Sequence, residues 1–233
     1  MDGFLMLLRW LHFLFGITWI GLLYYLNFVQ TPFFAETEAA VRSGAQQKLL
    51  PRVLWWFRWG AMGTVIFGAI YLIIWWSREG YGLNTWAIAI LTGGTLGIIM
   101  WANVWLVIWP KQKVVIANAI ATAGGAPSNP AAASAGLRAA LASRTNVLFS
   151  IPMLFFMGAA SHYALFTQSN PHLRRVAAWL VICGAIVALI EINALVGTQG
   201  VTKKPLDTIP GVIWSGFVLW VILTGIIVLV FRS

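Results

Sequence analysis

Six long apolar segments constrain the fold of this chain more than any other feature of its sequence. A membrane-spanning helix needs about 20 apolar residues. Only 9% of the residues are charged, compared with about 25% in a soluble domain. Backbone polar groups in lipid must bond within their own segment, so each segment is expected to be helical. The sequence predicts an all-α polytopic transmembrane bundle, formed as one domain over residues 1–233, with spans at 4–28, 53–76, 85–109, 147–166, 176–196 and 212–231.

The basic residues indicate how these spans are oriented. The net charge of +9 comes from residues near the span ends, which favours a membrane orientation signal over nucleic-acid binding. The side reached after the first, third and fifth spans carries ten basic residues: Arg42, Lys48, Arg52, Arg58, Lys111, Lys113, Arg138, Arg144, Lys203 and Lys204. The other side carries five: Arg9, Arg78, Arg174, Arg175 and Arg232. We therefore expect a multi-pass protein of the bacterial inner membrane with both termini in the periplasm.

The longest connection, residues 111–146, falls on the predicted cytoplasmic side. Its two Ala-rich arms favour helix, because alanine has the highest helix propensity. The stretch GGAPSNP at 124–130 interrupts them with turn-forming residues. The sequence predicts two helical arms joined by a flexible tip.

Two histidines are the intramembrane polar residues that point most directly to chemistry, since polar groups in lipid are costly and often functional. His12 lies eight residues into the first span, and His162 lies four residues before the end of the fourth. These positions correspond to about 12 Å and about 6 Å of helix, so both fall in the same half of the membrane. Two histidines on different helices at similar depth suit the two axial ligands of a b-type haem.

Small residues and one cation accompany these histidines. Gly16 lies one turn after His12, and Gly158 one turn before His162, where a haem would need clearance. Arg9 lies one turn before His12 and is a candidate partner for a haem propionate. Small residues equally mark ordinary helix packing in membranes, and an intramembrane histidine can simply bond a neighbouring helix. A covalently attached c-type haem is excluded, because Cys183 is the only cysteine.

Three further polar residues lie near the ends of the third and fifth spans. Asn103, Glu191 and Asn193 form a candidate polar pocket on the predicted inner side. Glu191 is interpreted as a proton carrier, a substrate partner or a protonated carboxyl bonded to Asn103. A hydrogen bond between helices with no further role is the competing interpretation.

Four stretches carry a resemblance to known proteins: LHFLFGITWIGL at 11–22, NVWLVIWPKQK at 103–113, SRTN at 143–146 and SIPMLFFMGAASH at 150–162. The first resembles a broad group of haem-associated membrane proteins that includes membrane-type protoporphyrinogen oxidase and copper-resistance D-type proteins. Together the four resemble the membrane domain of bacterial urate hydroxylase, the urate oxidase N-terminal family. The resemblance is clearest over residues 4–166.

This resemblance implies an inner-membrane protein that transfers electrons in a redox reaction, with haem b near His12 and His162. In the family, the membrane domain precedes a periplasmic cytochrome c domain and is associated with urate oxidation. This chain ends at Ser233 without a cytochrome c motif, so the resemblance implies a separate cytochrome c as partner.

A second interpretation is a non-catalytic accessory subunit of a larger respiratory or photosynthetic membrane complex. The 14 Trp and 14 Phe side chains would then contact lipid, pigments or neighbouring subunits. A small transporter ranks last, because the chain has no repeat symmetry or paired broken helices of the usual transporter kind.

Overall fold

The computed structural model describes residues 2–80, 82–166 and 170–232, and this part of the chain is almost entirely helical, with no strand. The helical elements in chain order are α1 (Asp2–Tyr24), η1 (Tyr25–Gln30), α2 (Thr31–Glu36), α3 (Ala39–Lys48), α4 (Leu50–Glu79), α5 (Thr85–Ala102), η2 (Asn103–Ile108), α6 (Trp109–Ala123), α7 (Ala131–His162), α8 (Leu173–Leu195), η3 (Val201–Lys203), α9 (Lys204–Asp207) and α10 (Ile209–Phe231).

Six helical stretches are long and apolar enough to cross a membrane, which confirms the predicted all-α polytopic fold. They are Asp2–Glu36, Leu50–Arg78, Thr85–Ala123, Ala131–His162, Leu173–Leu195 and Ile209–Phe231.

The third and fourth spanning stretches are longer than the spans predicted from the sequence. The third stretch continues to Ala123, and the fourth begins at Ala131. Both arms of the 111–146 connection are therefore helical, and they meet at residues 124–130. Alanine favours a helix in both arms, whereas the predicted spans mark only the most apolar part of each helix.

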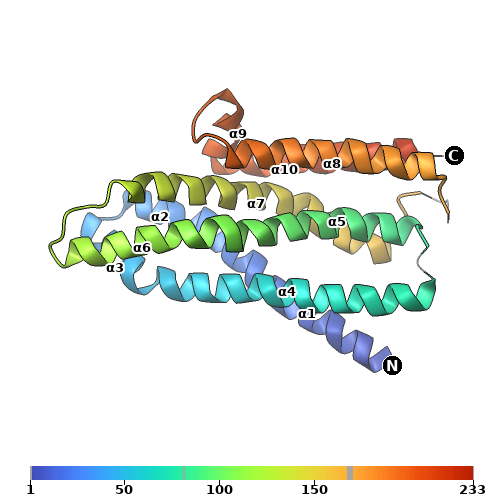
Figure 1. Ribbon diagram of the computed structural model, residues 1–233, viewed down its shortest axis with the longest axis horizontal. Helices are drawn as coiled ribbons and strands as arrows, with labels where there is room; N and C mark the ends of the chain where they lie inside the picture. Colours follow the sequence, from blue (N-terminus) through green and yellow to red (C-terminus); the bar gives the residue numbers. More distant parts are fainter. Residues whose placement is uncertain (1, 81, 167–169, 233) are drawn as a thin grey trace. The chain divides into compact units, whose positions relative to one another are not determined.

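The chain divides into two compact units. The first unit contains Met1–Ile70 and Trp101–Asn146. Within it α3 packs along α6, as Figure 1 shows. Gly60 of α4 lies so close to α1 that a Cβ there would be 3.1 Å from the backbone nitrogen of Trp19. This close approach sets the spacing of α1 and α4.

The second unit contains Tyr71–Met100 and Val147–Ser233. Its helices α8 and α10 pack against each other, and α8 covers most of α10 in the view of Figure 1. Glycines also allow close packing here. A Cβ on Gly93 would be 3.2 Å from the Met153 carbonyl oxygen, and one on Gly216 would be 2.9 Å from the Leu148 carbonyl oxygen. Small residues at helix contacts are typical of membrane bundles, because they let backbones approach.

Candidate functional site

His12 is the predicted site residue with the most defined surroundings. It lies on α1 in the first unit, and its Nδ1 is 2.8 Å from the carbonyl oxygen of Thr64 on α4. A carbonyl oxygen only accepts hydrogen bonds, so Nδ1 must be the donor. In the neutral imidazole, Nε2 then keeps its lone pair. The bond to Thr64 therefore presents the ring in the tautomer that ligates a metal through Nε2.

Gly68 makes room for the imidazole on α4. A Cβ at this position would be 2.6 Å from Nδ1 of His12 and 2.8 Å from Cε1. Gly68 lies four residues after Thr64, so it is on the same helix face as the carbonyl that accepts the His12 hydrogen bond. Any larger residue at 68 would displace the ring from that carbonyl.

The other predicted haem residues are divided between the units. Gly16 packs against α4, where a Cβ would be 3.8 Å from Cγ2 of Thr64, so its observed contact is helix packing. Arg9 is exposed on α1. His162 is the last residue of α7 in the second unit and is exposed. Gly158, one turn earlier, is also exposed, and no atom lies within 4 Å of a Cβ built on it.

Two π-helical segments, η1 and η2, interrupt spanning stretches of the first unit. Each precedes a proline at the start of the following helix, Pro32 in α2 and Pro110 in α6. A proline inside a helix lacks the N–H donor and clashes with the carbonyl four residues earlier. A wider turn before each proline relieves that clash, and such turns are frequent at functional sites.

Each π-helical segment contains an asparagine bonded to α7. The Asn27 side-chain nitrogen donates to the Leu23 carbonyl and to the Ser143 hydroxyl, both at 2.8 Å. The Asn103 side-chain nitrogen donates to Oδ1 of Asn146 at 3.0 Å. Ser143 and Asn146 are three residues apart and share a face of α7. The result is a buried polar belt, formed by Asn27, Ser143, Asn103 and Asn146.

Thr145 and Gln30 are among the buried polar residues of the same unit that have a side-chain atom without a described hydrogen-bond partner. The Thr145 hydroxyl is in a fully buried residue, and Gln30, whose Oε1 lacks a donor, is 7% exposed. Buried polar atoms are nearly always satisfied, often by ordered water. The region of the polar belt therefore has hydrogen-bonding capacity beyond what the described residues use.

The polar belt gives a direct prediction for Asn103. Replacing Asn103 by leucine removes the donor to Asn146 and leaves a buried amide oxygen short of a partner. We expect a loss of about 1–2 kcal/mol in stability, measured as a lower thermal midpoint in detergent. The double variant with Asn146→Leu should be less destabilised than the sum of the single changes, because the two side chains interact. Strictly additive effects would show that the pair is not coupled.

The three residues of the predicted polar pocket are divided between the two units. Asn103 belongs to the first unit, whereas Glu191 and Asn193 lie on α8 in the second. Asn193 Oδ1 accepts from the Lys203 ammonium at 3.1 Å, and its nitrogen donates to the Thr202 carbonyl at 3.1 Å. Lys203 is 3% exposed and also donates to the Val196 carbonyl at 2.9 Å. This lysine caps the C-terminus of α8, where cations are favoured.

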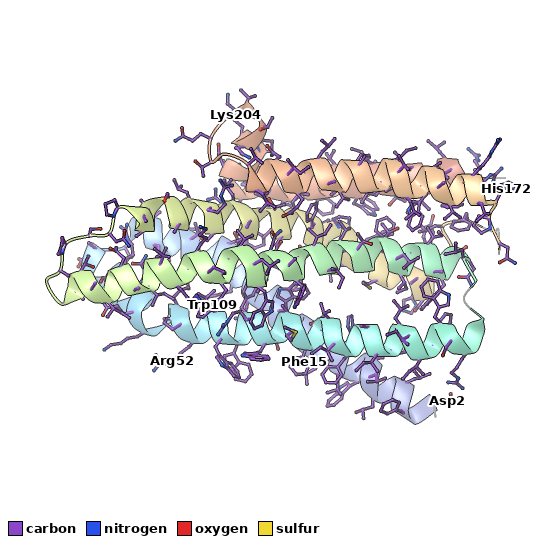
Figure 2. All side chains as sticks on the ribbon, viewed as in Figure 1. Asp2, Phe15, Arg52, Trp109, His172 and Lys204 are labelled. Atoms are coloured by element: carbon purple, nitrogen blue, oxygen red, sulfur yellow. The ribbon has the colours of Figure 1, made fainter. Side chains whose placement is uncertain are left out.

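Arg58, a basic residue of α4, makes cation–π contacts with two tryptophans. The Arg58 guanidinium carbon lies 3.6 Å from the ring centre of Trp109, which is labelled in Figure 2, and 5.5 Å from that of Trp105. Nε of Arg58 donates to the Leu54 carbonyl at 3.2 Å. The short distance makes Trp109 a packing partner of Arg58. Cation–π contacts of this kind stabilise a guanidinium most when water is excluded.

Several contacts of the site could not be predicted from the sequence. Thr64 contributes a backbone carbonyl, which no side-chain pattern identifies, and Gly68 matters only because His12 packs on it. Asn27 and Ser143 are recognisable as intramembrane polar residues, but their pairing depends on how α1 and α7 pack.

One protein family model matches the chain, urate oxidase N-terminal, over residues 82–227. The match covers more than half of the chain and includes the resembling stretches at 103–113, 143–146 and 150–162. It also takes in the last two spans and leaves out the His12 stretch, so the wider haem-associated resemblance stays a prediction. No curated protein and no solved structure matches the chain. On the family match, this chain belongs to the urate oxidase N-terminal family.

Proposed function

We propose that this urate-hydroxylase-related membrane protein binds haem b and transfers electrons in a membrane redox reaction. The observation that carries the proposal is the hydrogen bond from Nδ1 of His12 to the Thr64 carbonyl. Metal-ligating histidines almost always donate their other ring nitrogen to a carboxylate, carbonyl or water, and this bond fixes the ring and raises ligand basicity. The imidazole of His12 fits a haem ligand in this respect.

Each of these residues would have its own role in binding the haem. His12 would supply a nitrogen ligand to the haem iron, while the Thr64 carbonyl would orient its ring and Gly68 would leave space for it. Arg9, exposed one turn earlier on α1, supplies a positive charge for a propionate. Haem held there would supply a one-electron redox centre, and a separate cytochrome c is the proposed acceptor. His162 is the proposed second ligand, because the sequence predicts that it lies in the same half of the membrane as His12.

Absorption spectra of the detergent-purified protein test this function. The parent protein, expressed with sufficient haem, should show a b-type band in a reduced-minus-oxidised spectrum. His12→Ala and His162→Ala should each lose it, because each removes a proposed ligand of the haem iron. His172→Ala is the matched control, since His172 is exposed and precedes α8, and it should keep the band. A colourless parent protein, or full colour in His12→Ala, would overturn the proposal.

A second candidate is the accessory subunit of a larger membrane complex. The exposed aromatic residues on α10 favour it, because Trp214 is 68% exposed and its ring lies 6.0 Å from that of Phe217. Aromatic residues are enriched at protein interfaces. A native gel run beside the spectra separates the two functions: a colourless protein that migrates with a large complex would support the accessory role.

A further inference from the structure

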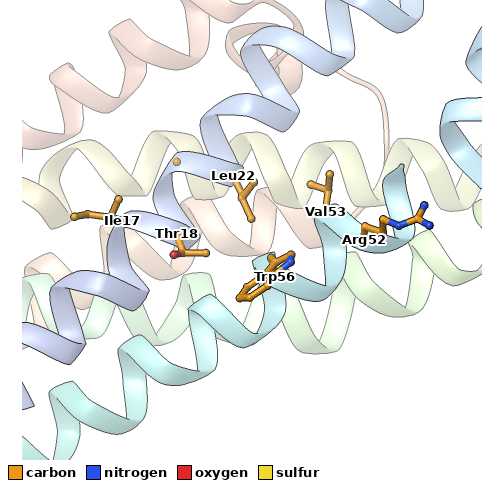
Figure 3. Close-up of a pocket in the computed structure, with 7 residues that line it drawn as sticks. Ile17, Thr18, Leu22, Arg52, Val53 and Trp56 are labelled. Atoms are coloured by element: carbon orange, nitrogen blue, oxygen red, sulfur yellow. The ribbon is translucent and has the colours of Figure 1, made fainter. Parts of the chain in front are cut away.

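An open groove of about 400 Å³ runs between α1 and α4 in the first unit (Figure 3). Its α1 wall is formed by Ile17, Thr18 and Leu22, and its α4 wall by Arg52, Val53 and Trp56. Figure 3 shows Ile17 at one end of the groove and Arg52 at the other. The groove is a different site from that of His12.

The groove is apolar along its length. Ile17 is 73% exposed and Trp56 is 58% exposed. The Thr18 hydroxyl donates to the Leu14 carbonyl of its own helix at 3.1 Å, so its polar atom is already satisfied. Gly21 also lines the groove, and no atom lies within 4 Å of a Cβ built on it. Both helices that form the groove are long and apolar enough to span a bilayer.

A positive charge lies at one end of the groove. Arg52 is exposed, and its guanidinium donates to the Lys48 carbonyl. A guanidinium has five N–H donors, so one such bond leaves donors for an anion. Lys48, one turn earlier, is also exposed, and residues 39–78 contain no Asp or Glu. No acidic side chain in this stretch competes for the two cations.

We propose that this groove binds an anionic phospholipid, with one acyl chain lying along Gly21 and the phosphate on Arg52. An apolar groove beside an exposed arginine complements an amphiphile with an anionic head. Arginine binds phosphate bidentately, tryptophans such as Trp56 favour the membrane interface, and basic sites beside spanning helices bind anionic headgroups.

Native mass spectrometry of the full chain in detergent tests the headgroup contact. Phosphatidylglycerol and phosphatidylcholine with identical acyl chains are titrated separately, and phosphatidylglycerol should bind more tightly. Arg52→Gln should weaken its binding about fivefold and remove the preference, because one cation near a membrane surface contributes about 1 kcal/mol. Lys111→Gln is the matched control: it removes an exposed charge of the same unit outside the groove, and it should keep the preference.

A second pair of variants tests the acyl chain. Gly21→Leu places a side chain in the open space of the groove and should lower phosphatidylglycerol binding, whereas Gly94→Leu, another position with no atom within 4 Å, should leave it unchanged. Circular dichroism checks that all variants fold. Equal binding by Arg52→Gln and Lys111→Gln would overturn the proposal. So would unchanged binding by Gly21→Leu, since it would indicate an anion held on the surface without a chain in the groove.

Discussion

Replacing Gly68 by alanine is expected to reduce haem binding about 10–100-fold, the range in which outer-shell partners of metal ligands act. The change leaves both candidate ligands in the sequence. Its effect is on geometry, because the new Cβ would be 2.6 Å from Nδ1 of His12. The imidazole would have to move away from the Thr64 carbonyl and would lose the bond that fixes its tautomer. Haem titration into the haem-free protein, followed by absorbance, measures the affinity.

Gly21→Ala is the matched control for this prediction. Gly21 lies on α1, and no atom lies within 4 Å of a Cβ built on it, so alanine should leave both the fold and haem affinity unchanged. Circular dichroism establishes whether each variant is helical. If Gly68→Ala is folded and binds haem as the parent does, His12 does not need its contact with α4, and the Thr64 carbonyl has no part in haem binding.

A large stability effect is expected at Gly216, where α10 touches α7. A Cβ there would be 2.5 Å from Cδ1 of Ile151 and 2.9 Å from the Leu148 carbonyl oxygen. The Ile151 side chain can rotate, but the carbonyl belongs to the α7 backbone, so the two helices would have to separate. Overpacking of this kind costs about 1–3 kcal/mol. Gly216→Ala should therefore lower the thermal midpoint in detergent by several degrees.

Gly225 provides the control on the same helix. No atom lies within 4 Å of a Cβ built on Gly225, and alanine is the better helix former by about 1 kcal/mol. Gly225→Ala should therefore leave the midpoint unchanged or raise it. Opposite signs for the same chemical change on one helix would identify close packing as the cause, whereas equal destabilisation by both variants would contradict it.

The sequence predicted the spanning segments because hydropathy is a local property. The second and last of the predicted spans, 53–76 and 212–231, lie within Leu50–Arg78 and Ile209–Phe231. The helix ends were less predictable. Residues 110–123 and 131–146 are helical although they fall outside the predicted spans, because alanine is a strong helix former.

The sequence also identified polar residues whose burial in lipid demands a partner, which include His12 and Asn103. It could not name the partners. His12 bonds a backbone carbonyl 52 residues away, and Asn103 bonds Asn146, 43 residues away. Neither separation leaves a periodic signal, because a hydrogen bond between helices depends on their rotation and spacing.

The sequence by itself thus determined that the chain is a membrane-spanning bundle, the approximate positions of its helices and its family. Only the tertiary structure decided that Gly68 gives His12 access to the Thr64 carbonyl, that Asn27 and Asn103 bond α7, and that a groove between α1 and α4 ends at Arg52. The physical reason is that lipid selects each helix by its own composition, whereas close approaches and buried hydrogen bonds depend on which faces of two helices meet.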